Sequence, residues 1–273
     1  MPTPLIPSEA DALAEWARRV RANAEQVERY REEAPATDFY APVAQSFAAD
    51  PRRLDEPVLD ILRSLVEPGE TWLDIGAGGG RYALPLALLA NEVVAIDPSD
   101  GMLDVLRAGM EEHGIRNIRI VQDRWPMPDA PRAEVAFIAN VGYDIADIGP
   151  FLDAMEASAT RQCVAVLLGE APATAAAAFW PAVHGVEREL LPGLPEFLSL
   201  LMARGRFFEV RLAERGPGFA HDPEGMLRFL RQQLWVAAGG EKDQILERTL
   251  RERGDEIFNR SSPPVGVVTW KPR

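Results

Sequence analysis

The sequence predicts an α/β protein whose core is a largely parallel β-sheet. Three observations support this fold class. Apolar runs of strand length alternate with helical segments between residues 71 and 168. Those runs are apolar almost throughout, which is typical of strands that are covered on both faces. The first run also leads directly into four glycines and then a helix, as at the ligand-binding edge of such sheets.

Residues 1–53 are predicted to form a helical cap. Ser8 and Asp11 form a helix-capping pattern, and apolar residues then recur at helical spacing. This helix is expected to end before Pro35, because a residue that precedes proline is pushed out of the helical region. A shorter segment that contains Tyr40 then leads to the core.

Residues 54–170 are predicted to form the core of the sheet. Strands that alternate with helices are usually joined by right-handed crossovers, which makes them parallel. The strands are expected at 71–75, 92–96, 118–121, 135–139 and 163–168, and the helices at about 57–65, 82–89, 101–113 and 148–158.

Residues 171–273 are predicted to contain helical insertions and the last strands of the sheet. The alternation of strands and helices stops after Leu168, and the following segment, 171–205, is rich in Ala, Pro and Leu. Pro223 is a good first helical residue, and the helix that it starts is expected to run to the Gly239-Gly240 pair. A further helix is expected over 242–253, and strands at 207–212 and 265–270.

The composition excludes several functional classes. The chain has 273 residues, 47% apolar and 26% charged, as in ordinary folded proteins. Its net charge of −13 has the wrong sign for gripping phosphate backbones, so no nucleic-acid partner is expected. No apolar run reaches the roughly 20 residues of a membrane span, and the start lacks the pattern of a secretory signal. The single cysteine, Cys163, lies in an apolar strand. A cytoplasmic protein without a membrane partner is expected.

The glycine-rich turn carries the strongest functional signal, and it can be interpreted in two registers. From Gly78 onward the turn fits a dinucleotide-binding loop, with Asp97 placed to hold a ribose. From Asp74 onward, an acid followed by Gly76, Gly78 and Gly80 fits the loop of proteins that bind S-adenosylmethionine (SAM). Two unit charges about 4 Å apart interact by about 4 kcal/mol at an effective dielectric near 20. Asp74 would therefore repel a diphosphate and attract the cationic SAM, which favours the second register.

Three motifs, in order, resemble those of the class I SAM-dependent methyltransferases: Asp74–Arg81, Val93–Leu103 and Val121–Asp123. The resemblance covers about residues 54–168. It implies a Rossmann-like seven-stranded sheet, parallel except for its penultimate strand in sequence order, with helical N-terminal and inserted lid segments. It also implies SAM as the cofactor, S-adenosylhomocysteine as the product, and methyl transfer to a small-molecule acceptor.

The same resemblance assigns roles to individual residues. Asp74 and the backbone of the three glycines would hold the methionine part of SAM, and Asp97 would accept hydrogen bonds from both ribose hydroxyls. Met102 either packs on the adenine or belongs to the core of its helix, and Asp123 either takes the adenine amino group or is a solvated loop acid. The remaining cofactor candidates are Pro98 beside the adenine, the backbone N–H of Arg124 at a ring nitrogen, and Asn140 after the fourth strand.

The acceptor site is less well defined. Transfer from a sulfonium depends mainly on positioning, so no catalytic residue is required. Tyr143 and His184 are the candidates, although Tyr143 is equally consistent with a core tyrosine whose hydroxyl is hydrogen-bonded. Tyr40, Trp180 and His221 are further candidates for the wall of an apolar pocket under a lid. No histidine lies near the end of the fourth strand, where related enzymes often carry a base, and no spacing resembles a metal site.

We therefore expect a methyltransferase that uses SAM and acts on a small molecule. Two alternatives remain. A nicotinamide-dependent oxidoreductase would use the first register of the glycine loop. A SAM-binding protein without catalytic activity would keep the cofactor pocket and lack the acceptor site.

Overall fold

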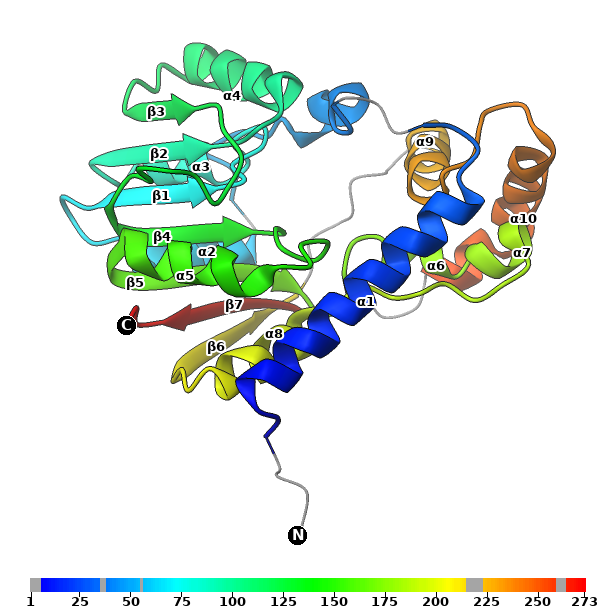
Figure 1. The fold of residues 1–273 in the computed structure, drawn as a ribbon. Helices are drawn as coiled ribbons and strands as arrows, with labels where there is room; N and C mark the ends of the chain where they lie inside the picture. Colours follow the sequence, from blue (N-terminus) through cyan, green and yellow to red (C-terminus); the bar gives the residue numbers. More distant parts are fainter. Residues whose placement is uncertain (1–5, 35–37, 55, 215–222, 259–263) are drawn as a thin grey trace, which may run out of the picture.

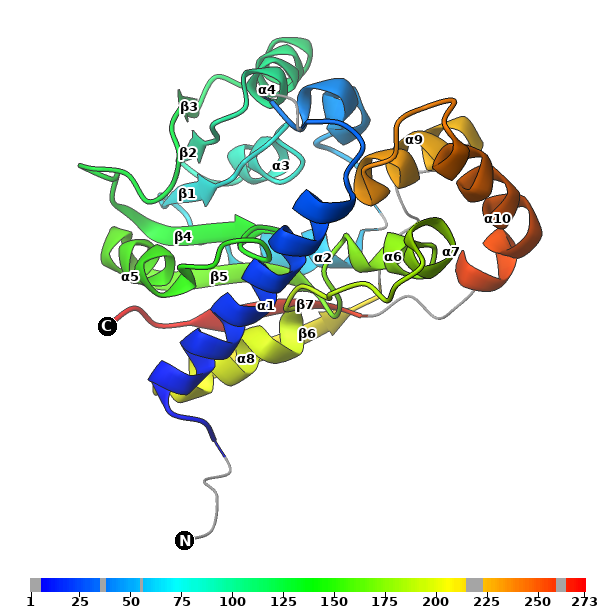
Figure 2. The same ribbon diagram turned by 45° about the vertical axis from the view of Figure 1, so that its right-hand side comes forward.

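The computed structural model describes residues 6–34, 38–54, 56–214, 223–258 and 264–273. A twisted sheet lies at the centre, with helices packed on both of its faces (Figure 1). A further group of helices stands beyond the edge at which the parallel strands end, and the long first helix runs between this group and the sheet (Figures 1 and 2).

All seven expected strands are present, and β4 and β5 begin earlier than predicted. The strands are β1 Thr71–Ile75, β2 Glu92–Ile96, β3 Ile118–Val121, β4 Ala133–Ala139, β5 Ala159–Leu168, β6 Phe208–Ala213 and β7 Val265–Trp270. Their order in the sheet is β3-β2-β1-β4-β5-β7-β6, and the first five are parallel to one another.

The position of the antiparallel strand differs from the prediction. Strand β7 pairs antiparallel with both β5 and β6, so β6 runs in the same direction as the other strands. The odd strand is the last in sequence and lies next to last in the sheet, and the prediction that the penultimate strand in sequence would be reversed is wrong.

The helices that flank the sheet are amphipathic and divide between its two faces. Apolar residues of α1, α5 and α8 cover one face, and those of α2, α3 and α4 cover the other. The Ser8 hydroxyl accepts a hydrogen bond from the Asp11 N–H at 3.2 Å, which confirms the predicted cap of α1. The helices are α1 Glu9–Tyr30, η1 Ala41–Phe47 (a 3₁₀ helix), α2 Pro57–Leu65, α3 Ala83–Ala87, α4 Asp100–His113, α5 Ile148–Ser158, α6 Thr174–Ala177, α7 Trp180–His184, α8 Leu194–Ala203, α9 Pro223–Leu234 and α10 Glu241–Phe258.

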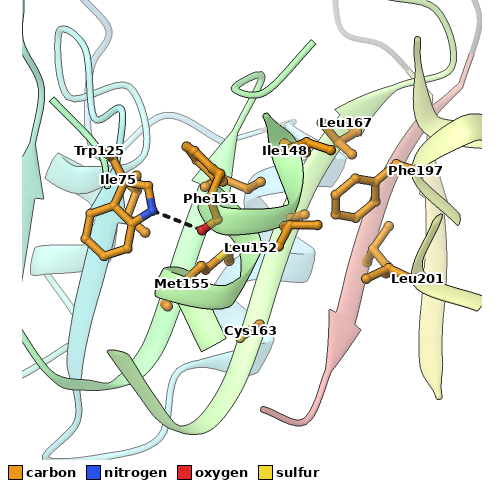
Figure 3. Close-up of a cluster of buried hydrophobic side chains, with 14 of the residues drawn as sticks. Ile75, Trp125, Ile148, Phe151, Leu152, Met155, Cys163, Leu167, Phe197 and Leu201 are labelled. Carbon is orange, nitrogen blue, oxygen red and sulfur yellow. Dashed lines mark hydrogen bonds between the residues drawn. The ribbon is translucent and has the colours of Figure 1, made fainter. Parts of the chain in front are cut away.

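Packing on the first face is continuous from the strands through α5 to α8 (Figure 3). Trp125, in the loop after β3, donates its indole N–H to the carbonyl oxygen of Phe151 at 3.2 Å and so fastens that loop to α5. Cys163 is fully buried in the same cluster, and this burial raises the pKa of its thiol.

The remaining helices, α6, α7, α9 and α10, form a small helical unit with its own apolar core. Phe179, Trp180, Leu230 and Leu246 are fully buried in it. The unit lies in the part of the chain after β5 where helical insertions are expected.

Candidate functional site

The glycine-rich loop joins β1 to α3 at the end of the parallel strands. Gly76, Gly78 and Gly80 all have positive φ angles, of 76°, 52° and 82°. A Cβ atom on Gly76 would come within 2.5 Å of Val141, and one on Gly80 within 2.5 Å of Leu106. Two of the glycines therefore allow close packing of the loop against neighbouring elements. At Gly78 the nearest atom to such a Cβ is 3.8 Å away, so only the backbone conformation requires glycine there.

The N–H groups of these glycines are already hydrogen-bonded, to the loop itself and to the end of β2. Gly76 donates to the carbonyl oxygen of Ile96 at 2.7 Å, Gly80 to that of Ala77 at 3.0 Å, and Gly78 to an oxygen of Asp97 at 2.8 Å. The protein uses these N–H groups to fix the shape of the loop against the end of β2.

Asp74 lies on β1, directly before the loop. Its side chain is 2% exposed, and its Oδ1 atom is buried without a hydrogen-bond partner. Burial, with a further contribution from the negative charge of Asp97, raises the pKa of Asp74 to about 8. The carboxyl is therefore mostly protonated at pH 7, which weakens the assumption of a full charge at this position. A cationic group placed beside it would favour the ionised form and satisfy the unpartnered oxygen.

Asp97, at the end of β2, connects the two halves of the loop region. One of its oxygens accepts the Gly78 N–H, and the other accepts the N–H of Ser99 at 2.9 Å. Each carboxylate oxygen has a second lone pair for another donor, which is what two ribose hydroxyls require. Burial raises the pKa of Asp97, and the nearby Asp38 adds to this. Asp97 thus has a structural task besides the predicted ligand contact.

Asp38 organises the segment before η1, and sequence reasoning missed it. Its Oδ1 accepts the N–H groups of Tyr40 and Ala41, and its Oδ2 accepts the Ser99 hydroxyl at 2.7 Å and the Gly101 N–H at 3.3 Å. A Cβ on Gly101 would approach Ala41 to 3.0 Å, so the two segments are in close contact. An Asp side chain that accepts the N–H two residues later is a common turn pattern. The distant partners of Asp38, Ser99 and Gly101, cannot be recognised from the sequence.

Tyr40 is brought to the cofactor edge by this anchoring. Its side chain is 46% exposed, and its ring lies against those of Phe39 and Phe47. The protein atoms around it and the negative charges of Asp144 and Asp97 raise the pKa of Tyr40 to about 12. Its hydroxyl is therefore neutral at physiological pH. Asp144, exposed in the loop after β4, is a second residue of this region that the sequence did not single out.

The other adenine-side candidates differ in their exposure. Met102 is buried and packs with Val105 and η1, consistent with its alternative as a helix core residue. Pro98 and Asp123 are exposed. The Arg124 N–H donates to the side chain of Asp123 at 2.7 Å, so contact with a ring nitrogen would require this bond to open.

Asn140 and Tyr143 lie where β4 ends. Asn140 is exposed and has a φ of 57°. The Tyr143 ring is buried, and its hydroxyl accepts the N–H of Leu168 at 2.7 Å and lies 3.4 Å from the Asn140 side-chain oxygen. Tyr143 thus ties the ends of β4 and β5 together, which corresponds to the alternative of a core tyrosine with a hydrogen-bonded hydroxyl.

Trp180 and His184 belong to the helical unit. Trp180 is completely buried in the core of this unit. His184 contacts the carbonyl oxygen of Leu234 through Nε2 at 2.9 Å, and its ring lies 4.2 Å from that of Trp180. Burial lowers the pKa of His184. His221 lies outside the described residues.

Two further features of the described residues bear on the site. They contain no group of three His, Cys, Asp or Glu side chains arranged to hold a metal ion. A shallow cavity of about 370 Å³ lies between the end of α4 and β3, lined by Arg107 and Ile115 among others. Because α4 begins three residues after Asp97 and ends at His113, this cavity lies at the far end of α4 from the candidate site.

The centre of the chain is similar to known proteins. Residues 73–158 match a family model described as a methyltransferase domain. A segment is 35% identical over 81 residues to the ubiquinone biosynthesis O-methyltransferase of Azorhizobium caulinodans, covering 29% of this chain and 32% of that protein. Another is 31% identical over 94 residues to the probable ribosomal RNA small subunit methyltransferase A of Methanosphaera stadtmanae, covering 34% of each. These matches span about a third of the relatives' length.

Solved structures share the fold over most of their length. A SAM-dependent methyltransferase from Thiobacillus denitrificans, in complex with S-adenosyl-L-homocysteine, has a TM-score of 0.53 and 17% identity, and the match covers 85% of this chain and 99% of that one. The [4+2]-cyclase SpnF also has a TM-score of 0.53, with 14% identity and 98% of each chain covered. The second likeness shows that this fold is not confined to one reaction.

Proposed function

Since residues 73–158 match the family model of a methyltransferase domain, we propose that the protein transfers a methyl group from SAM to a small-molecule acceptor. The observation that carries the proposal is the environment of Asp74. A buried carboxyl with an unpartnered oxygen is costly in a folded protein, and the ammonium group of SAM would satisfy it. The carboxyl borders a loop whose glycines let other elements approach closely.

The residues of the site would act by binding and orienting. Asp74 would hold the ammonium group, and the free lone pairs of Asp97 would accept the ribose hydroxyls. SAM supplies a methyl group that its sulfonium has already activated. The task left to the protein is to hold acceptor and cofactor in line and to exclude water. Tyr40 and Asp144 would border the acceptor, because both lie near Asp97 at the end of the strands.

Electrostatics supports a small molecule over RNA as the acceptor. Some relatives of the domain are named as ribosomal RNA methyltransferases, which makes RNA the second candidate. The chain carries 42 acidic and 29 basic residues, and carboxyls of Asp38, Asp97 and Asp144 surround the Tyr40 region. A phosphate backbone at this edge would meet like charge, and its binding is normally driven by Lys and Arg.

We also propose a cytoplasmic location. The only cysteine, Cys163, is buried and unpaired, as in proteins of reducing compartments. Among the described residues, no helix combines the length and apolar character that crossing a bilayer demands.

The first experiment tests the cofactor. Thermal unfolding is measured with S-adenosylhomocysteine and, separately, with NADH. A ligand at about 100 times its dissociation constant adds roughly 2.7 kcal/mol of stability, so S-adenosylhomocysteine is expected to raise the melting temperature. A shift with NADH alone would favour the oxidoreductase alternative and contradict the proposal.

The second experiment tests turnover and acceptor class. SAM labelled in its methyl group is incubated with the protein and a cell extract, and the label is counted separately in small molecules, RNA and protein. Label is expected in the small-molecule fraction, and Asp97→Asn is expected to reduce it strongly. Label in RNA alone would contradict the proposed acceptor. Cofactor binding without any transfer would favour the non-catalytic alternative.

A further inference from the structure

Strand β6 forms one edge of the sheet, and no other strand of the described residues pairs with its outer side. An edge strand presents unpaired backbone N–H and C=O groups that can pair with another strand. Large apolar residues are exposed at both ends of β6, with Phe207 98% exposed and Leu212 63% exposed. In the described part of the chain, no large apolar side chain is more exposed than Phe207.

The sequence of β6 is complementary to itself when two copies run antiparallel. Glu209 and Arg211 point to the same face of the strand, on either side of Val210. A two-fold axis through Val210 places Glu209 opposite the partner's Arg211, and Arg211 opposite the partner's Glu209. The same axis places Phe208 opposite the partner's Leu212. Opposite charges and apolar pairs directly across two strands are stabilising.

Neighbouring registers lose this complementarity. Moving the two-fold axis by one residue places either Glu209 opposite the partner's Glu209 or Arg211 opposite the partner's Arg211, and like charges in those positions are destabilising. The charges therefore select one register. Within one chain, the Arg211 Nε atom lies 2.8 Å from Glu209 Oε1, but both side chains are well exposed. Arg211 also donates to the Ser64 hydroxyl at 3.2 Å. Exposed contacts of this kind contribute little, and the pairing proposed below requires them to rearrange.

We propose that the protein forms a symmetric dimer in which β6 pairs antiparallel with β6 of a second copy. The two sheets become one continuous sheet, and the interface uses the same patch of both copies, as a two-fold axis requires. β6 lies at one edge of the sheet, whereas the glycine loop lies between β1 and β2, near the other edge. The dimer therefore leaves the candidate cofactor site uncovered, and the proposal does not depend on the proposed function.

Charge reversal tests the register. The mass of the full chain is measured by size-exclusion chromatography with light scattering over a range of concentrations, and the parent is expected to be a dimer. Glu209→Arg and Arg211→Glu, taken singly, each replace two opposite-charge pairs by like-charge pairs, and each is expected to weaken the dimer about tenfold or more. Mixing the two variants restores both opposite-charge pairs, so a heterodimer is expected. The double variant Glu209→Arg/Arg211→Glu is expected to dimerise like the parent.

A matched control keeps the test specific. Glu112→Arg makes the same charge change on exposed α4, away from β6, and is expected to leave the dimer unchanged. Thermal unfolding of each variant shows whether it is folded. A monomeric parent at all concentrations would overturn the proposal, and so would a dimer that both single variants leave intact. Failure of the mixed variants to associate would overturn the register.

Discussion

Asp74→Asn is expected to raise the stability of the ligand-free protein and to lower its affinity for the cofactor. Both effects arise from the buried carboxyl, which destabilises the ligand-free protein and binds a cation. The buried carboxyl has an unpartnered oxygen, and its pKa is raised from 3.8 to about 8. Folding at neutral pH requires this carboxyl to take up a proton, which lowers the free energy of unfolding. The carboxyl contributes binding energy only when a cation lies beside it.

The size of the stability effect follows from proton linkage. Below about pH 4 the carboxyl is protonated in both the folded and unfolded states, and the free energy of unfolding is unaffected. As the pH rises toward 8, the unfolded state loses this proton and the folded state keeps it, so stability falls. One pKa unit corresponds to 1.36 kcal/mol. Between pH 3.8 and pH 7 the loss reaches about 4 kcal/mol for the carboxyl, and it is absent in the asparagine variant.

The assay compares denaturant unfolding of parent and variant at several pH values between 4 and 8. The stability difference is expected to grow in favour of the variant as the pH rises. Asp144→Asn removes an exposed carboxyl at the same edge and is the matched control, for which no such growth is expected. The same pH slope in the parent and in Asp74→Asn would refute the reasoning.

Cofactor affinity provides the second half of this prediction. A hydrogen bond to a charged group is worth about 1.5–3 kcal/mol, so the variant is expected to bind S-adenosylhomocysteine roughly ten to a hundred times more weakly at pH 8. For the parent, affinity is expected to increase from pH 6 to pH 8, because binding requires the ionised carboxyl and therefore releases a proton. Calorimetry in buffers with different ionisation enthalpies measures this release, and equal affinities of parent and variant would contradict the assigned partner.

Two further variants test how the site is held, and a third tests a buried ion pair away from it. Gly80→Ala is expected to destabilise the fold by about 1–3 kcal/mol more than Gly69→Ala. Both glycines have positive φ, but only a Cβ atom on residue 80 would meet another residue, at 2.5 Å. Equal melting temperatures of the two variants would contradict this. Asp38→Ala removes the hydrogen bonds that anchor the segment before η1. Calorimetry is expected to show a severalfold loss of S-adenosylhomocysteine affinity, with little loss of stability. Unchanged affinity would show that this segment does not contribute to the site. Glu156→Ala leaves the buried Arg206 guanidinium without its carboxylate. Denaturant unfolding is expected to show a loss of about 3–5 kcal/mol in the free energy of unfolding. A loss below about 1 kcal/mol would count against a buried ion pair.

Much of the site was predictable because it is local in sequence. A strand that runs into a glycine turn, with Asp74 before the turn and Asp97 at the end of the next strand, is specified by residues that lie close together along the chain. The prediction placed both carboxyls at the strand ends, and the structure has them there. The sequence could not show that the glycine N–H groups are already hydrogen-bonded, since acceptors such as the Ile96 carbonyl come from a neighbouring strand.

The sequence alone determined the approximate places of the strands and of the helices between residues 57 and 158, and the glycine turn after the first strand, because spacing, capping residues and glycine conformation act over a few residues. Only the tertiary structure decided the direction of β7, the burial of Tyr143 and Trp180, and the anchoring role of Asp38. It also converted Asp74 from an ordinary acid into one with a raised pKa. Each of these depends on groups far apart in sequence, which folding brings together and removes from water.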